Sequence, residues 1–345
     1  MTLRLLSRPA PTSPGYSLPT SLHNQPRIAE PDFTSVRVRG KEAIANGIWR
    51  FTLCRPDGAP MGEFSAGSHL TVVLPAGMRR NYSLCSDPAD PSAWQIAVWR
   101  DAGGRGGSIS MVDDVQQGDL IEVSAPRNNF ALQPRASQFL FIAGGIGITP
   151  ILAMMLQLAQ RPDCHFRLIY CTRDAASTAF LKELQNPLFA GRVQMHHDQG
   201  DPAKAIDLWP VFETPGAEQV YCCGPRGLME AVADMSGHWP SGAIHFESFG
   251  VDASAQASNH AFTVFLQRSQ ARLTVAANQS LLEALRANGQ RITSSCESGT
   301  CGSCRTGLLA GEAEHRDMVL GEDEKASQIM VCVSRARSTE LVLDL

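Results

Sequence analysis

Short runs in which apolar and polar residues alternate fill the chain from residue 32 to residue 134. Glycine, proline and aspartate separate these runs, which include VRVRG, GIWRFTL, HLTVVLP, NYSLC, WQIAVWR and DLIEVSAP. Alternation with a period of two, between closely spaced turns, is typical of an antiparallel sheet that closes into a barrel. The pattern predicts a β-barrel over residues 32–134, preceded by a flexible leader rich in proline and serine over residues 1–31.

The pattern changes near Gln138, where QFLFIAGG forms an uninterrupted apolar run. The segment TPILAMMLQLAQ after it has helical spacing, with Thr149 as the expected N-cap and Pro150 as the first helical residue. Further apolar runs, FRLIYCT, RVQMHHD and QVYCCGP, alternate with helical stretches. Buried strands in alternation with helices predict an α/β domain with a parallel sheet over residues 135–250.

The small polar segment VDASAQASNH, residues 251–260, is typical of a linker. Beyond it, AFTVFLQRS and ARLTVAA predict a hairpin. The run SLLEALRANG predicts a helix with a capping box from Ser280 to Glu283, ending at Gly289. A last strand, ELVLDL, completes a small α+β unit over residues 261–345. The predicted chain is therefore multidomain, with an antiparallel β-barrel, an α/β parallel-sheet domain and a C-terminal α+β domain.

Composition narrows the class of protein without changing this picture. Of the 345 residues, 43% are apolar and 19% are charged, and the net charge is −4. These values exclude a disordered chain, a collagen-like fibre and a coiled coil. No apolar run approaches the roughly 18 residues of a membrane helix, no basic block favours nucleic acid, and the N-terminus lacks the features of a secretory signal. We expect a cytoplasmic protein with neither a nucleic acid nor a membrane as its partner.

The ten cysteines fall into two groups. Six lie in or beside apolar runs and are expected to be small buried hydrophobes, namely Cys54, Cys85, Cys164, Cys171, Cys222 and Cys223. The other four, Cys296, Cys301, Cys304 and Cys332, have C-x4-C-x2-C spacing followed by one distant cysteine, which is the plant-type [2Fe–2S] arrangement. The alternative is a structural zinc site made of the same four thiolates, although zinc sites more often use two short C-x2-C hooks.

Two motifs in the predicted barrel offer what a flavin needs, which is a cation for its phosphate, an aromatic surface and a hydroxyl near N5. Arg80, Tyr82 and Ser83 offer these in that order. The second motif, Gly104-Arg105-Gly106-Gly107-Ser108, precedes a predicted helix, where backbone N–H groups cradle an anion. Each motif alone also arises by chance or as an ordinary turn. Their order within one barrel favours the flavin.

The predicted α/β domain has a glycine-rich turn where a dinucleotide binds. Gly144, Gly145, Gly147 and Thr149 lie between a strand and a helix, where a pyrophosphate rests. The turn lacks the full G-x-G-x-x-G fingerprint, so it decides little by itself.

A second turn of the same sheet completes the nicotinamide hypothesis. Cys223, Gly224 and Pro225 end a later strand, so the glycine admits the nicotinamide ring and Cys223 lies near the hydride path, with a buried structural cysteine as the alternative. Asp174 follows the second strand, where an acid binds the adenine ribose and repels a 2′-phosphate. The neighbouring Arg173 favours a phosphate instead. NADH is the expected donor.

Taken in order, these motifs resemble the phthalate dioxygenase reductase family, which includes the vanillate demethylase reductases. The resemblance covers residues 33–345 and rests on R-N-Y-S-L, G-R-G-G-S, G-G-I-G-I-T-P, Y-C-C-G-P and C-E-S-G-T-C-G-S-C, together with the stretch GEAEHRDMVLGEDEKASQIMVCVSRARS. It implies FMN as the flavin, NADH as the donor, and a C-terminal ferredoxin domain whose cluster passes single electrons to a Rieske oxygenase.

The resemblance also implies roles for particular residues. FMN is expected to bind Arg80, Tyr82, Ser83, Arg105, Gly106, Gly107 and Ser108. Ser83 is expected to hydrogen-bond N5, while Cys223 and Thr149 shape the nicotinamide pocket. Phe249 is expected to cover the isoalloxazine face, with Glu247 nearby, and an interdomain packing role is the alternative for Phe249.

Other functions and the partner remain open at this stage. The reductase of a vanillate-type aryl O-demethylase is one alternative, and a stand-alone flavin oxidase or nitric-oxide-type dioxygenase is another. A zinc-stabilised binding module is a third. We expect a monomer that docks transiently with its oxygenase near the cluster. The acidic run over residues 311–325 is either part of that docking face or a solvated loop.

Overall fold

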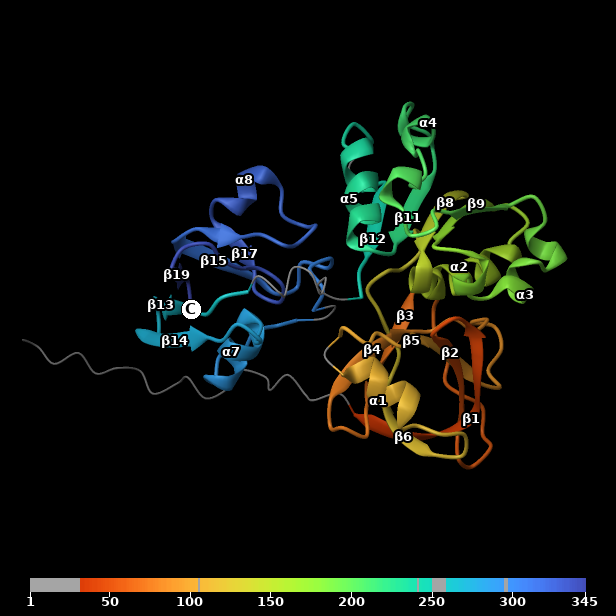
Figure 1. Cartoon of the computed structure of the whole chain (residues 1–345), viewed down its shortest axis with the longest axis horizontal. Helices are drawn as coiled ribbons and strands as arrows, with labels where there is room; N and C mark the ends of the chain where they lie inside the picture. Colours follow the sequence, from red (N-terminus) through yellow and green to blue (C-terminus); the bar gives the residue numbers. More distant parts are fainter. Residues whose placement is uncertain (1–31, 105, 241, 250–258, 295–296) are drawn as a thin grey trace, which may run out of the picture. The chain divides into compact units, whose positions relative to one another are not determined.

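The computed structural model describes residues 32–104, 106–240, 242–249, 259–294 and 297–345 (Figure 1). The predicted leader, residues 251–258 of the predicted linker, Arg105 and Cys296 lie outside the described residues. The described chain has the expected fold class, because an antiparallel barrel is followed by a parallel α/β sheet and then by an α+β unit. In the described part of the chain, no helix combines the length and apolar character that crossing a membrane requires.

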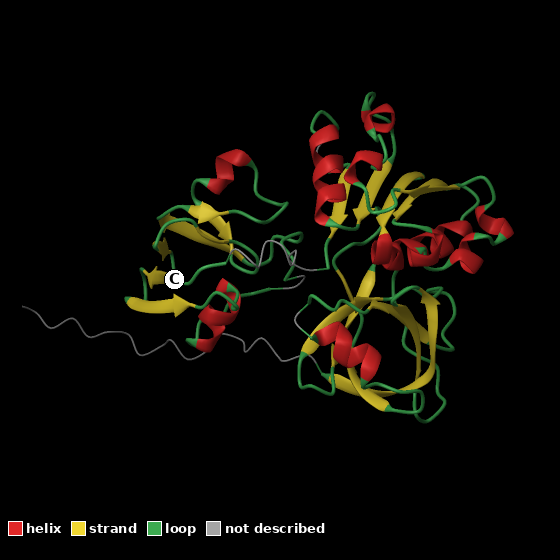
Figure 2. Cartoon of the chain, viewed as in Figure 1, coloured by secondary structure: helices red, strands yellow, loops and turns green. Residues whose placement is uncertain are grey.

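The first sheet is antiparallel and has the strand order β4-β3-β6-β1-β2-β5, with β7 beside β3. Its elements are β1 (Phe33–Ala45), β2 (Ile48–Cys54), β3 (Ser68–Val73), β4 (Arg79–Ser83), β5 (Trp94–Trp99), α1 (Gly107–Asp113), β6 (Leu120–Ser124) and β7 (Arg127–Asn128). A bridge between Leu84 and Ile96 joins the two ends of this order, and Figure 2 shows the strands as a ring. Alternate residues such as Val38, Phe51 and Leu70 fill its interior, so the predicted barrel is confirmed.

The second sheet is parallel and has the order β10-β9-β8-β11-β12. Its elements are β8 (Gln138–Gly144), η1 (Gly145–Gly147), α2 (Ile148–Ala159), β9 (His165–Thr172), η2 (Ala175–Ser177), α3 (Leu181–Leu184), η3 (Pro187–Phe189), β10 (Val193–His197), η4 (Pro202–Lys204), α4 (Trp209–Phe212), β11 (Gln219–Cys223), α5 (Arg226–Met235) and β12 (Ile244–Glu247). The chain reverses its direction of growth between β8 and β11. Ligands of open α/β sheets bind at the carboxyl ends of the strands at such a switch point.

Helix α2 begins earlier than its sequence suggests. Gly147 is the N-cap, and Thr149 is the second helical residue rather than the cap. The reason is the glycine-rich η1 turn, which leads directly into the helix and lets the Thr149 hydroxyl donate back to the carbonyl of Ile146 at 3.0 Å. The expected N-cap at Thr149 was therefore wrong.

The third unit has a five-stranded sheet with the order β14-β13-β19-β15-β17 and a separate β16-β18 pair. Its elements are β13 (Phe262–Leu266), β14 (Ala271–Val275), α7 (Leu281–Ala287), β15 (Arg305–Ala310), β16 (Ala313–Glu314), α8 (Glu322–Lys325), β17 (Gln328–Met330), β18 (Arg335–Ala336) and β19 (Glu340–Leu343). The β13–β14 hairpin is confirmed. The capping box is also confirmed, since the side chains of Ser280 and Glu283 each accept a hydrogen bond from the other's backbone N–H.

Candidate functional site

Strand β4 carries the first flavin motif. The ring of Tyr82 packs against the barrel core, and its buried hydroxyl has no hydrogen-bond partner among the described residues. Burial raises the pKa of Tyr82, so the group is a neutral phenol. A buried polar atom without a partner costs about 1–3 kcal/mol. This hydroxyl is therefore placed to donate a hydrogen bond to an oxygen atom of a ligand.

Arg80 brings the second flavin motif to the first. A Cβ atom at Gly107 would lie only 2.5 Å from Nε and 2.8 Å from Cγ of Arg80, so the arginine side chain lies across the start of α1. Gly106, just before the helix, has a φ of 79°, which favours glycine. The absence of a side chain at residue 107 lets the arginine lie against the start of α1, beside the turn at Gly106. This arrangement fits a phosphate.

The other residues of the second motif that the structure describes, Gly104 and Ser108, lie next to Asp101. The hydroxyl of Ser108 accepts a hydrogen bond from the backbone N–H of Asp101 at 3.1 Å, which closes the loop before α1. Gly104 lies against the carboxylate of Asp101, 2.8 Å from where its Cβ would be. Arg105, a predicted FMN ligand, lies outside the described residues. The assignments of Gly104, Arg105 and Ser108 to the flavin stay predictions.

Ser83 and Glu247 connect the barrel to the α/β domain. The Ser83 hydroxyl, at the end of β4, donates a hydrogen bond to Oε2 of Glu247, at the end of β12, over 3.2 Å. Both side chains are buried. Cys223, the last residue of β11, is the register partner of Glu247. Burial, and then the Glu247 charge, raise the pKa of the Cys223 thiol well above its ordinary value, so this thiol is neutral.

Three glycines shape the switch point of the parallel sheet. A Cβ at Gly147 would lie 2.1 Å from the carbonyl oxygen of Cys223, and one at Gly224 would lie 2.9 Å from Cα of Gly144. A Cβ at Gly144 would lie 2.4 Å from Cδ of Pro225, the N-cap of α5. The turns after β8 and β11 therefore touch backbone to backbone. This close packing sets the two turns side by side at the carboxyl edge of the sheet, which is where a dinucleotide binds in α/β folds.

Asp174 and Arg173 follow β9 at the same edge of the sheet. The Asp174 carboxylate accepts a hydrogen bond from the backbone N–H of Ser177 at 2.8 Å. The side-chain hydrogen bond with Ser177, and then this backbone bond, lower the pKa of Asp174, so the group is ionised. Gly145, on the neighbouring turn, has a φ of 51° and open space around it. Phe249 lies two residues after β12 and is 45% exposed, so it is not a buried packing residue in this structure.

The cysteine loop of the third unit is tightly folded. Cys304 and Cys332 are buried, Cys301 is partly exposed, and Cys296 lies outside the described residues. Gly299 has a φ of 79°, and a Cβ there would lie 2.8 Å from Cγ2 of Val333. The loop therefore contacts the segment that carries Cys332.

Thiolate donors on such a loop fit a [2Fe–2S] cluster. Among the described residues, no three His, Cys, Asp or Glu side chains are close enough to hold a metal ion. Cys296 is not among those residues. The sulfur of Cys301 lies 3.0 Å from the hydroxyl of Ser303, a contact of the kind that tunes iron–sulfur centres.

The other cysteines divide less cleanly than expected. Cys85, Cys164, Cys222 and Cys223 are buried, as predicted. Cys54 and Cys171 are half-buried, so for these two the prediction of full burial was wrong. Both lie near the carboxyl ends of their strands, β2 and β9.

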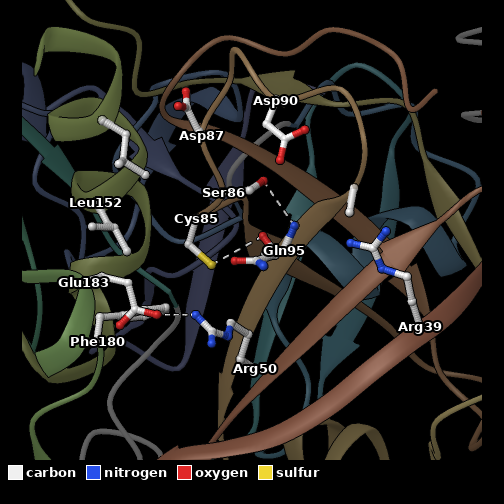
Figure 3. Close-up of a pocket in the computed structure, with 12 residues that line it drawn as sticks. Arg39, Arg50, Cys85, Ser86, Asp87, Asp90, Gln95, Leu152, Phe180 and Glu183 are labelled. Atoms are coloured by element: carbon white, nitrogen blue, oxygen red, sulfur yellow. Dashed lines mark hydrogen bonds and ion pairs between the residues drawn. The ribbon is translucent and has the colours of Figure 1, made fainter. Parts of the chain in front are cut away.

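Sequence reasoning missed a polar cavity beside the barrel. Figure 3 shows this cavity, which has a volume of about 190 Å³ and is lined by charged residues that include Arg39, Arg50, Asp87 and Glu183. None of the predicted flavin or nicotinamide residues lines it. A single arginine on a strand resembles any surface arginine in the sequence, so no local pattern indicated this cavity.

Two family models match the chain in the order that the fold shows. A family described as an oxidoreductase NAD-binding domain matches residues 141–234, and one described as a 2Fe-2S iron-sulfur cluster binding domain matches residues 264–337.

Similar proteins cover nearly the whole chain. The chain is 55% identical to a phthalate dioxygenase reductase of Burkholderia cepacia, over 92% of this chain and 98% of the relative. It is 56% identical to the reductase subunit of a phthalate 4,5-dioxygenase of Pseudomonas putida, over 91% and 97%. A vanillate O-demethylase oxidoreductase of Pseudomonas putida is 38% identical, over 87% and 96%.

A solved structure agrees with these relatives. The structure of phthalate dioxygenase reductase, described as modular for electron transfer from pyridine nucleotides to [2Fe–2S], matches with a TM-score of 0.75 and 55% identity. The match covers 91% of this chain and 98% of that one. Because the identity extends through the barrel, the NAD-binding domain and the cluster domain, the chain is an oxidoreductase that belongs to the phthalate dioxygenase reductase family.

Proposed function

We propose that this chain is the NADH-dependent reductase component of a Rieske-type aromatic-ring oxygenase. The observation that carries the proposal is the meeting of Ser83 with Glu247 at the end of β12, beside Cys223. This contact joins the flavin motif to the edge strand next to β11, one strand away from the switch point of the parallel sheet. The cluster domain that follows on the same chain supplies the one-electron carrier that passes electrons to the oxygenase.

The cofactors carry the redox chemistry and the protein positions them. When bound, FMN accepts a hydride from NADH and the [2Fe–2S] cluster accepts electrons one at a time. Arg80 and the start of α1 hold the flavin phosphate, and the Tyr82 hydroxyl donates a hydrogen bond to the ligand. Ser83, whose hydroxyl proton Glu247 accepts, presents the lone pairs of its oxygen toward N5.

The α/β domain binds and orients the nicotinamide dinucleotide. Gly145 and Gly147 admit the pyrophosphate, and Gly224 admits the nicotinamide ring. Thr149 stabilises the glycine-rich turn through its hydrogen bond to the carbonyl of Ile146. Cys223 lines the nicotinamide pocket as a neutral thiol and takes no part in proton transfer. Phe249 covers the flavin face. Asp174 binds the adenine ribose and makes NADH the preferred donor.

Cys296, Cys301, Cys304 and Cys332 are the proposed ligands of the [2Fe–2S] cluster. The spacing of the four thiolates is the plant-type one, and Cys304 and Cys332 are buried in the same unit. The domain limits 32–134, 135–250 and 261–345 belong to this proposal. They agree with the change of sheet after β7 and again after β12.

A phthalate-type oxygenase is a better partner than an aryl O-demethylase. The phthalate reductases are 55% and 56% identical to this chain, whereas the vanillate relative is 38% identical. The reductase is proposed to be a cytoplasmic monomer that docks transiently near its cluster. Cluster thiolates persist in a reducing compartment, which supports this location.

An anaerobic titration of the purified protein with NADH tests the proposal. We expect visible absorbance to show bleaching of both the flavin and the iron–sulfur bands, and low-temperature EPR to show a rhombic one-electron signal. Flavin bleaching without the EPR signal would show that the four cysteines hold zinc or no metal. A colourless protein would leave only the zinc-stabilised module. Electron delivery to a phthalate oxygenase, compared with a vanillate O-demethylase, then decides between the two partners.

A further inference from the structure

The barrel and the α/β domain share an interface with an apolar part and a polar part. In the apolar part, Ala66, Cys85 and Phe130 of the barrel belong to one buried cluster with Met154 and Phe139 of the α/β domain. The polar part is the cavity of Figure 3, where side chains from both domains face each other. Apolar contacts are non-directional, so they stabilise the interface without fixing its orientation.

Arg50 crosses the polar part of this interface. It lies on β2 and is paired both with Glu42 on β1 of its own barrel and with Glu183 on α3 of the α/β domain. The side chains of Arg50 and Glu183 are 19% and 32% exposed, whereas that of Glu42 is 55% exposed. Burial alone lowers the pKa of Arg50, but the hydrogen bonds to the two carboxylates outweigh it and leave the pKa raised. The ion pair between Arg50 and Glu183 is thus less exposed to solvent than the ion pair between Arg50 and Glu42.

The Arg50–Glu183 pair lies beside the short segment that begins at Ser83. Cys85 and Ser86 line the cavity together with Arg50 and Glu183, and Cys85 follows Ser83 by two residues. The intervening Leu84 is fixed by its bridge to Ile96. The short segment after β4 therefore contacts the α/β domain at both ends, through Ser83 to Glu247 and beside Arg50 and Glu183.

We propose that Arg50 and Glu183 form a positioning pair, which holds the α/β domain at the angle where Glu247 and Cys223 face Ser83. Charged hydrogen bonds are short and directional, so this pair adds to the orientation that the bonds from Asn46 to Ala176 and from Ser83 to Glu247 also favour. The inference rests on the proposed function, because the reaction that the pair serves is hydride transfer from NADH to the flavin.

The structure supplies a matched pair of variants. Glu183→Gln removes the carboxylate that reaches Arg50 across the interface, and Glu42→Gln removes the carboxylate on the barrel side of the same guanidinium. In both variants Arg50 keeps one carboxylate partner, so neither leaves an unpaired buried charge, which would be strongly destabilising. Both variants are purified as holoprotein, and their flavin and iron contents are compared with those of the wild type.

Two measurements distinguish the variants. In Glu183→Gln, we expect the rate constant of flavin reduction by NADH to fall about tenfold, with a smaller change in the half-saturating NADH concentration, because a small misplacement of the reacting groups is costly. We also expect faster hydrogen exchange at the amide of Asn46, which donates to the carbonyl of Ala176 across the interface at 2.7 Å. In Glu42→Gln, both quantities should stay at their wild-type values.

Equal rates in Glu183→Gln and the wild type would overturn the positioning role, as would equal losses in the two variants. If Glu183→Gln does not accumulate as folded protein, Glu183→Asp is compared with Glu42→Asp in the same two measurements. A wild-type protein that NADH does not reduce would refute the proposed function, and the positioning role with it. Normal reduction that the Glu183 variants leave unchanged would refute the positioning role alone.

Discussion

The Ser83 hydroxyl and the Glu247 carboxylate lie 3.2 Å apart although the barrel contributes one and the parallel sheet the other. Because Ser83 donates in this bond, the lone pairs of its oxygen point away from the carboxylate. Glu247 therefore fixes the orientation of a hydroxyl that follows directly from the Arg80 and Tyr82 motif. The contact also holds the end of β12 next to the end of β4.

Ser83→Ala should slow the reduction of flavin by NADH and leave the cluster content unchanged. The loss of one neutral hydrogen bond is worth about 0.5–1.5 kcal/mol, which corresponds to a rate decrease of about two- to thirteenfold. Anaerobic stopped-flow absorbance measures this rate. Ser124→Ala is the control, since Ser124 is a buried serine of the same barrel that bonds only to backbone groups. An unaltered rate in Ser83→Ala would remove Ser83 from the mechanism.

Tyr82→Phe should affect the flavin-free and flavin-bound forms in opposite directions. The Tyr82 hydroxyl is buried and has no partner in the part of the chain that the structure describes, so its removal should leave the melting temperature of the flavin-free protein unchanged or slightly higher. FMN binding should weaken by about three- to tenfold, because the ligand loses a hydrogen bond. Thermal unfolding and a fluorescence titration with FMN give the two values. Weaker stability together with unchanged FMN affinity would contradict the assignment.

Gly147→Ala should disturb the dinucleotide turn. The added Cβ would lie 2.1 Å from the carbonyl oxygen of Cys223, and overpacking of this kind costs about 1–3 kcal/mol. We expect a lower melting temperature and weaker NADH binding, measured by calorimetry. Gly227→Ala is the control, because a Cβ at Gly227 in α5 meets nothing within 4 Å and alanine favours the helix. Equal behaviour of the two variants would show that the turns after β8 and β11 can separate freely.

His245 should make the stability of the α/β domain depend on pH. Burial lowers its pKa from the ordinary value of 6.5, so the unfolded chain binds this proton more readily than the folded chain. Its contribution to stability is therefore fully present above about pH 6.5 and is lost as the pH falls through the lowered folded pKa. His245 also stacks on Tyr221 with ring centroids 4.4 Å apart.

The test compares thermal unfolding at about pH 7.5 and pH 5.5, the range in which histidine titrates. His245→Gln should lose less stability on acidification than the wild type. His165→Gln, at an exposed histidine, should behave like the wild type. If His245→Gln loses as much stability between the two pH values as the wild type does, the pH dependence comes from other groups.

The acidic run over residues 311–325 should contribute little to docking. Glu322 pairs with Lys325, Glu324 with Arg305, and Glu314 with Arg316, so much of its charge is compensated within the chain. We expect Glu322→Gln combined with Asp323→Asn to change the rate of electron transfer to the oxygenase less than about twofold, since exposed pairs are worth little. A steep loss of rate at low salt, absent at high salt, would instead support an acidic docking face.

Local patterns in the sequence were sufficient for much of the fold. Two-residue alternation identified the barrel because one face of each strand is buried, and the capping box located α7 because Ser280 and Glu283 satisfy each other's backbone groups. Cysteine spacing identified the cluster domain for a similar reason, since three of the four proposed ligands lie in one short loop.

What the sequence did not reveal depends on contacts between distant segments. The start of α2 was misplaced because Thr149 resembles an N-cap, whereas the η1 turn before it makes Gly147 the cap. The pairing of Arg50 with Glu183 joins residues far apart in sequence, and no periodicity connects them. The compensation of the acidic run likewise requires Arg305, which precedes the run and approaches it only in the fold.

The first strand of the cluster domain pairs with the last strand of the chain. Thr263 to Leu266 lie in parallel register with Glu340 to Leu343, and Arg335 donates to the carbonyls of His260, Ala276 and Gln279. Strand β13 pairs with β14 locally in the hairpin, but its other neighbour, β19, lies far along the sequence, and such long-range pairing is slow. The sheet that carries the cysteine loop is therefore completed by a contact between its first and last strands, which forms later in folding than the local β13–β14 hairpin.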